Sequence, residues 1–200
     1  MIYLTLVFED ELSEFAMSKL ISRFGNKYKI HQTYQGYGFG YIKANIKGFN
    51  EASIVNPFFV LTDLDRYNCP LELIEEWLNF PKNPNLIFRI AVKEVEAWLL
   101  ADRGGFAAYT GVSIVNIPMK PELEIDPKRT LLNIVRGCGK RKIKEDILPK
   151  NNYAQIGPNY NGRLMEYVQH YWDLNRAIKN SESLQRAVSC LENFQQYLTH

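Results

Sequence analysis

The sequence predicts an α/β fold: a mostly parallel sheet flanked by helices, followed by a helical carboxyl-terminal portion. Over residues 1–102, short runs rich in β-branched and aromatic residues alternate with amphipathic helical patterns, as in parallel sheets. After residue 102, only helical and loop patterns follow. The chain has 200 residues, 46% hydrophobic and 23% charged, which is enough apolar surface for a core and excludes a disordered or collagen-like chain.

Four buried strands are expected in the amino-terminal half, because the runs are β-branched, aromatic or aliphatic. They cover residues 2–8, 28–34, 57–62 and 86–92. Helices are expected over residues 10–24, 70–80 and 93–102. The first of these helices begins with acidic residues, which suit the positive end of the helix dipole, and the second begins at a proline.

The carboxyl-terminal half is expected to be helical. Asp126 and Pro127, a cap followed by the proline favoured at the first helical position, start a helix that runs to about residue 135. Further helices are expected over residues 140–148, 162–177 and 182–198. We expect residues 1–110 to form the α/β core and residues 111–200 to pack on it as a helical extension, in one compact unit.

A glycine run, GYGFG at residues 36–40, follows the second predicted strand. Its spacing is superficially similar to the glycine fingerprint of dinucleotide-binding proteins, but it is GxGxG and no clear helix start follows it. We therefore predict a mobile or tight loop here rather than a phosphate-binding loop.

The formal net charge is only +2, which does not indicate a globally basic nucleic-acid-binding protein. Positive charge is concentrated in residues 120–163, where 10 basic and 5 acidic side chains give +5. Two interpretations stay open: a solvated helix face, or a surface that contacts nucleic-acid phosphates. In the second interpretation the contacting residues are Arg136, Lys140, Arg141, Lys142 and Lys144.

Three residues beyond the basic helix, Tyr153, Tyr160 and Arg163, have side chains of the type that stacks on a nucleotide. The alternative is that they are structural, and this is the stronger expectation. The sequence does not decide between the two.

Several features predict a soluble cytoplasmic protein with no membrane partner. No apolar run approaches the ~20 residues that cross a bilayer. The amino terminus lacks the basic region of a signal peptide. Three widely spaced cysteines, Cys69, Cys138 and Cys190, form neither a disulfide framework nor a metal-binding CxxC pair.

Three carboxylates follow predicted strands directly: Glu9, Asp63 and Asp65. The carboxyl ends of parallel strands share one edge of a sheet, where ligands usually bind, so these groups meet there if the two strands are neighbours. Asp63 and Asp65 are two positions apart and would point the same way in extended backbone. Facing carboxylates favour a hard cation such as Mg²⁺, whereas the alternative is that both aspartates are loop caps.

Glu96 is the most conspicuous charge of the chain. In a helix over residues 92–102, it falls within the apolar arc between Val92 and Leu100. A carboxylate among buried residues is costly unless it is paired, hydrogen-bonded or bound to a metal. The alternative to a metal ligand is an internal salt bridge to an arginine such as Arg89.

These motifs resemble those of Toprim-type domains: the glutamate after the first strand, TDLD at residues 62–65, and EVEAWLLAD at residues 94–102. The chain resembles most closely the Toprim-like domain-of-unknown-function family 4276, relatives of the OLD-type nucleases. The closing helix also resembles that family, so the resemblance spans nearly the whole chain. The chain departs from many Toprim domains at Asp10, where they have glycine after the glutamate.

The resemblance implies a Mg²⁺- or Mn²⁺-dependent phosphodiester hydrolase that acts on DNA or RNA. It implies that Glu9, Asp63, Asp65 and Glu96 are the metal-binding and catalytic residues, with Glu9 as a further candidate for general acid or base. It also implies a role as effector of an antiphage defence system, with an ATPase as partner, and a homo-oligomer is compatible with it.

Two other functions stay open. One is a non-catalytic subunit that keeps a Toprim fold and docks on an ATPase, using aromatics of the loop at residues 36–41 and the last helices. The other is a hydrolase of a small phosphorylated molecule. Binding of Mg²⁺ or Mn²⁺ through Asp63 and Asp65 separates an enzyme from a docking subunit.

Overall fold

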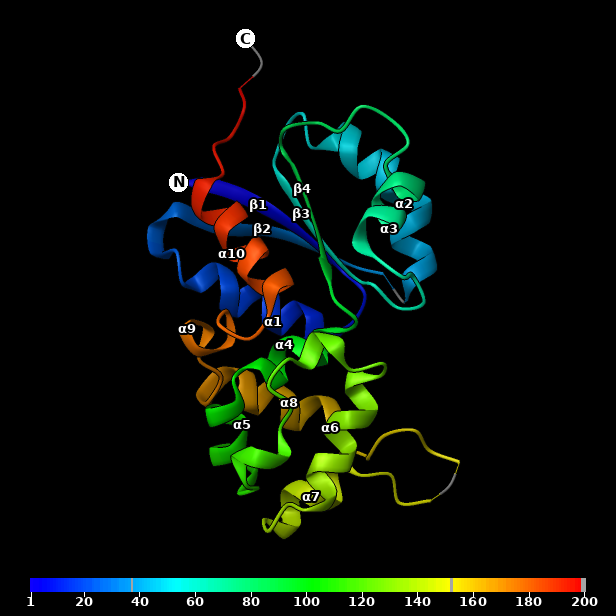
Figure 1. Ribbon diagram of the computed structural model, residues 1–200. Helices are drawn as coiled ribbons and strands as arrows, with labels where there is room; N and C mark the ends of the chain where they lie inside the picture. Colours follow the sequence, from blue (N-terminus) through cyan, green and yellow to red (C-terminus); the bar gives the residue numbers. More distant parts are fainter. Residues whose placement is uncertain (37, 152, 199–200) are drawn as a thin grey trace. The chain divides into compact units, whose positions relative to one another are not determined.

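The computed structural model describes residues 1–36, 38–151 and 153–198 and has the predicted α/β fold (Figure 1). Its internal contacts divide the chain into two units. Unit 1 comprises residues 1–92 and 186–200, and unit 2 comprises residues 93–185. The division therefore falls near residue 92, whereas a core of residues 1–110 with an extension of residues 111–200 stays a prediction.

Unit 1 is built on a four-stranded, all-parallel sheet in the order β2-β1-β3-β4. The strands are β1 (Ile2–Phe8), β2 (Tyr28–Gln35), β3 (Phe58–Asp63) and β4 (Leu86–Ala91). Successive strands run parallel, so each connection between them is a crossover. The connecting helices are α1 (Glu11–Ser22), α2 (Phe39–Ala52) and α3 (Pro70–Trp77). All four predicted strands are confirmed to within about a residue at each end.

Helices cover both faces of this sheet (Figure 1). On one face, α2 and α3 pack against β-strand residues in a core that includes Val7, Val60, Phe88, Ile46 and Trp77. On the other lie α1 and the end of α10 (Glu182–Asn193), the helix that runs from unit 2 into unit 1. A sheet buried on both faces explains why the strands are continuous apolar runs.

The glycine run leads straight into α2, which corrects the expectation that no helix starts there. Gly38 immediately precedes the helix at a φ of 94°, a left-handed conformation that glycine adopts without strain. The N–H of Gly36 donates to the carbonyl of Phe8 (2.7 Å), which extends the pairing of β2 with β1. The predicted docking contact through aromatics of the loop at residues 36–41 includes Tyr37, which lies outside the described residues.

Unit 2 is helical, as expected for the second half of the chain. Its helices are α4 (Val95–Ala101), α5 (Arg103–Thr110), α6 (Pro127–Arg136), α7 (Arg141–Ile147), α8 (Tyr160–His170) and α9 (Leu174–Ala177). Short 3₁₀ turns at Ile114–Asn116 and Pro121–Leu123 connect α5 to α6. The Asp126 cap is confirmed, because its carboxylate accepts the N–H of Arg129 (2.7 Å).

Several helix predictions differ from the structure: the helix expected over residues 70–80 ends at Trp77, and α5 was not predicted. The helix expected over residues 162–177 is divided into α8 and α9, because Asp173 caps a new helix by accepting the N–H groups of Asn175 and Arg176. The last helix ends at Asn193 rather than at residue 198. A 3.6-residue apolar pattern does not show where a side chain interrupts the backbone hydrogen bonds.

The helices are short throughout the described part of the chain. The longest that the structure describes, α2, has 14 residues. A bilayer requires ~20 apolar residues. No helix within residues 1–36, 38–151 and 153–198 is long and apolar enough to cross a membrane.

Candidate functional site

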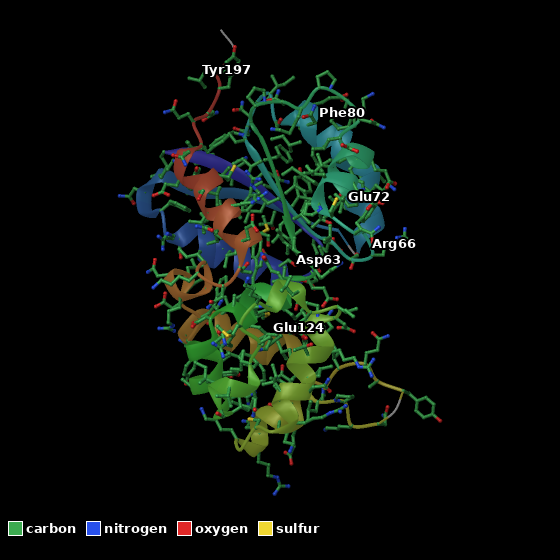
Figure 2. The ribbon with its side chains drawn as sticks, viewed as in Figure 1. Asp63, Arg66, Glu72, Phe80, Glu124 and Tyr197 are labelled. Carbon is green, nitrogen blue, oxygen red and sulfur yellow. The ribbon has the colours of Figure 1, made fainter. Side chains whose placement is uncertain are left out.

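The first candidate site lies at the carboxyl edge of the sheet in unit 1. Strands β1 and β3 are direct neighbours and parallel, so the residues that follow them come to the same edge. This confirms the neighbour relation on which the predicted grouping of Glu9 with Asp63 depends. Figure 2 labels Asp63 at the lower end of the sheet.

Glu9 is held at this edge by two hydrogen bonds from the neighbouring strand. Its Oε1 accepts the hydroxyl of Thr62 (2.5 Å) and the backbone N–H of Asp63 (3.1 Å). Burial raises the pKa of the Glu9 carboxyl, the two hydrogen bonds partly offset this, and the negative charges of Asp65 and Asp10 raise it further. The result is a fixed carboxylate, partly buried, in a negatively charged setting.

The two aspartates of TDLD do not continue the strand together. Asp63 is the last residue of β3, and Leu64 turns into the core, where it is 1% exposed. Asp65 then adopts a φ of 48°, in the left-handed region, and its side chain is exposed. The extended backbone that the expected common direction of the two carboxylates requires is therefore absent, because the backbone turns after Asp63.

Side chains in a strand alternate between the two faces of the sheet. Thr62 and Glu9 are on the same face because they are hydrogen-bonded. The alternation therefore directs the Asp63 side chain to the opposite face, while its N–H supports Glu9. The N–H of Asp63 is a donor at this edge, and the role of Asp63 as a metal ligand stays a prediction.

Within the described ranges, no group of three or more His, Cys, Asp or Glu side chains is arranged to hold a metal ion. Mg²⁺ does not require such a group, since it is commonly bound through one or two carboxylates, with waters and substrate phosphates as its other ligands. Glu9 and Asp65 supply two carboxylates, and the negative charge of Asp65 contributes to the raised pKa of Glu9. Carboxylate oxygens are the donor type that magnesium and manganese prefer, and a metal ion at this edge stays a prediction.

Glu96 lies in unit 2, and its predicted burial is confirmed at 3% exposed. Its Oε1 accepts the hydroxyl of Tyr160 (2.9 Å) and forms an ion pair with Nζ of Lys128 (3.4 Å). These contacts satisfy the requirement that a buried carboxylate be paired and hydrogen-bonded. The assignment of Glu96 as a metal ligand stays a prediction.

Glu94 lies beside this group at the start of α4. Its Oε2 accepts the backbone N–H of Lys128 (3.0 Å) at the start of α6. Burial raises the pKa of Glu94, the charge of Glu96 raises it further, and Lys128 opposes the shift. The two glutamates thus join α4 to α6 through one lysine.

The predicted phosphate-contacting residues of unit 2 differ in their contacts within the protein. Nζ of Lys140 donates to the carbonyls of Ala108 (3.0 Å) and Tyr109 (2.6 Å), so this lysine caps the end of α5. Arg141 pairs with Glu145 along α7 (2.7 Å). The other predicted phosphate contacts differ in exposure: Arg136 and Lys142 are exposed, and Lys144 is half-buried.

Two residues that matter to these groups were not predicted as members of them. Thr62, 1% exposed, orients Glu9, and the only sequence signal for it is a hydroxyl at the end of an apolar run. Tyr160 donates to Glu96 across 64 positions of sequence, a separation at which no local pattern operates. Arg163 bridges Asp146 (2.8 Å) and Glu166 (2.6 Å), so it has the structural role that was the stronger expectation.

Comparison of the chain with protein-family models, with curated proteins and with solved structures gives no match in any of the three. The resemblance to Toprim-like families thus depends on the short motifs described above. The function is therefore argued from the chemistry of the residues.

Proposed function

We propose that this protein is a metal-dependent phosphodiester hydrolase that cleaves DNA or RNA, with Glu9 and Asp65 at its centre. The observation that carries the proposal is the position of Glu9: it is oriented by Thr62 and the N–H of Asp63, yet surrounded by the charges of Asp65 and Asp10. Like charges kept together at a strand edge are stabilised by a cation.

Each residue has a part in this chemistry. A divalent ion, when bound, supplies charge neutralisation at the scissile phosphate and lowers the pKa of water. Thr62 and the Asp63 N–H keep the Glu9 carboxylate in one orientation. Glu9 is a ligand of this ion or instead, with its raised pKa, takes a proton from the attacking water and later releases it. The exposed carboxylate of Asp65 is accessible to a phosphate-bound cation.

The wider assignments are proposals that follow from the resemblance. They are that Asp63 and Glu96 complete the site, that nucleic acid and an ATPase are partners, and that the protein is an effector of antiphage defence in the cytoplasm. The alternative of a non-catalytic docking subunit is favoured by the lack of a three-ligand group among the described residues. Metal binding and cleavage by the parent protein distinguish the two.

The primary test is cleavage of single- and double-stranded DNA and RNA with Mg²⁺ or Mn²⁺, comparing the parent with Asp65→Asn. Asparagine tolerates the left-handed backbone of this position, so only the charge changes. We expect the parent to cleave, chelation to abolish cleavage, and Asp65→Asn to lose on the order of 10- to 100-fold in activity or metal affinity.

The matched control is Glu51→Gln, which removes an exposed carboxylate at the end of α2 and should leave the rate unchanged. Cleavage that persists in chelator would contradict the metal dependence. A parent protein that neither binds the ion nor cleaves would favour the docking subunit.

Thr62→Val should reduce cleavage without unfolding the protein. Valine matches the volume of threonine at this buried position but cannot donate to Glu9. Loss of a residue that orients a metal ligand typically costs about 10- to 100-fold in activity or affinity. Initial rates and thermal unfolding should be measured together, and Thr62→Ser, which keeps the hydroxyl, should retain most of the activity. If Thr62→Val is as active as the parent, orientation of Glu9 does not limit the reaction.

A further inference from the structure

The loop between α7 and α8 carries the most exposed aromatic side chain that the structure describes. Tyr153 is 98% exposed, so its ring contributes nothing to the core of unit 2. The loop projects away from α7 and α8 in Figure 1, where it is coloured yellow. The two other candidates for stacking are engaged elsewhere, since Tyr160 is buried and Arg163 is paired with two carboxylates.

The base of this loop is closed by backbone contacts. The N–H of Gly157 donates to the carbonyl of Ile147 (2.8 Å), and the N–H of Asn159 donates to that of Asp146 (3.0 Å). A Cβ at Gly157 would lie 2.3 Å from the Asp146 carbonyl oxygen, so only glycine permits this approach. The loop thus begins and ends at one point on the helical body.

A side chain also holds the backbone at Tyr153 and Ala154. Oδ1 of Asn151 accepts the N–H groups of Tyr153 and Ala154, each at 3.0 Å. This is the pattern of an Asx turn, in which the side chain replaces a backbone acceptor. The tyrosine is therefore presented from a defined turn, at low entropic cost for binding.

The charge around the loop favours an anion. Residues 147–159 contain Lys150 and no acidic residue. The two acidic residues of α7 are paired, Glu145 with Arg141 and Asp146 with Arg163. Lys142 and Lys150 are both exposed. Exposed lysines together with an exposed aromatic ring are the combination that binds single-stranded nucleic acid, in which phosphates pair with cations and bases stack on rings.

We infer that this loop binds single-stranded nucleic acid, with Tyr153 stacking on an unpaired base and Lys142 and Lys150 contacting phosphates. The inference rests on the proposed function, which gives nucleic acid as the substrate, and it specifies that this nucleic acid is single-stranded. In a duplex both faces of each base are covered by neighbouring base pairs, so an exposed tyrosine finds no base to stack on. In a single strand the faces are accessible.

The test is binding rather than cleavage, so that it succeeds or fails independently of catalysis. Fluorescence anisotropy with a labelled single-stranded oligonucleotide and its duplex, in the presence of a chelator, compares the parent with Tyr153→Ala and Tyr153→Phe. We expect Tyr153→Ala to weaken single-strand binding roughly 5- to 150-fold, the range for loss of one stacked base, and to change duplex binding little. Tyr153→Phe should bind as the parent does, because the ring is kept.

Two further variants serve as controls. Ile125→Ala removes an apolar side chain that is 94% exposed in the same unit and should not alter binding. Lys150→Gln should weaken binding and reduce the salt slope by about 1, whereas Lys179→Gln should not. Equal loss of single-strand and duplex binding in Tyr153→Ala, or no loss, overturns the inference. Selective loss without cleavage by the parent would support the inference and refute the hydrolase.

Discussion

Asp102→Ala should lower the free energy of unfolding by about 3 kcal/mol, the lower end of the range for disrupting a buried ion pair. The Asp102 carboxylate is fully buried and accepts four hydrogen bonds. Arg176 donates to both of its oxygens (2.6 and 2.8 Å), and the N–H groups of Gly105 (3.0 Å) and Asp173 (2.7 Å) complete the set. The lower value is expected because the Arg176 side chain is 49% exposed, so its guanidinium is hydrated by solvent when the Asp102 carboxylate is removed.

The loss comes chiefly from the backbone donors, which alanine leaves without an acceptor in a buried setting. Gly105 is adapted to this carboxylate, since a Cβ there would lie 2.2 Å from Oδ2 of Asp102. Urea unfolding of the variant measures the effect. Asp173→Ala is the comparison variant: it removes the Arg176 pair from a partly exposed position together with the cap of α9, and it should cost about 1 kcal/mol. A loss below about 1 kcal/mol for Asp102→Ala would contradict this account.

Glu9→Gln should inactivate the proposed hydrolase and stabilise the fold at neutral pH. Glutamine keeps an oxygen that accepts from Thr62 and Asp63, and it removes a charge that burial and Asp65 disfavour. Without the carboxylate, the proton transfer assigned to Glu9 is lost, which typically costs about 10²- to 10⁴-fold in rate. Higher stability with lower activity is the signature of a functional group kept at a structural cost.

The pH dependence of this stabilisation has a definite sign. The pKa of Glu9 is higher in the folded protein than in the unfolded chain, so the folded state favours the protonated form. The parent therefore loses stability as pH rises from about 4.3, the ordinary pKa of a glutamate, through the raised value. The gain from Glu9→Gln should be present at pH 8 and vanish towards pH 4.

Thermal unfolding of Glu9→Gln and the parent at several pH values measures this difference. Glu51→Gln is again the control, because Glu51 is exposed and its replacement should not produce a pH-dependent gain. A Glu9→Gln protein that is less stable than the parent at pH 8 would show that the hydrogen bonds, rather than the charge, dominate at this position.

The sequence predicted the four strands and the helices α1 and α3 of unit 1 because their signals are local. Each strand is a continuous apolar run, and in unit 2 the burial of Glu96 was expected from the apolar arc of its own helix. Helix α2, 14 residues long, was not predicted at all, because its first residues are glycines and aromatics with no capping side chain, and Gly38 replaces such a cap by its conformation. The same limitation applies to Asp65, whose left-handed backbone has no local sequence signal.

Sequence patterns do not predict which partners the polar and charged side chains bind. Lys140 belongs to the most basic run of the chain, yet its ammonium group caps α5, which lies about 30 positions earlier. Thr62 and Tyr160 contact their glutamates over 53 and 64 positions. Partners this far apart in sequence are determined by which strands and helices become neighbours, and periodicity does not contain that information.

The sequence by itself determined an α/β chain with four strands, a helical second half, and carboxylates that follow parallel strands. Only the tertiary structure decided the strand order β2-β1-β3-β4, the orientation of Glu9 by Thr62, and the exposure of Tyr153 on a closed loop. The physical reason is that apolar periodicity records which residues must leave water, whereas a hydrogen bond or an exposed ring depends on which groups the folded backbone brings together.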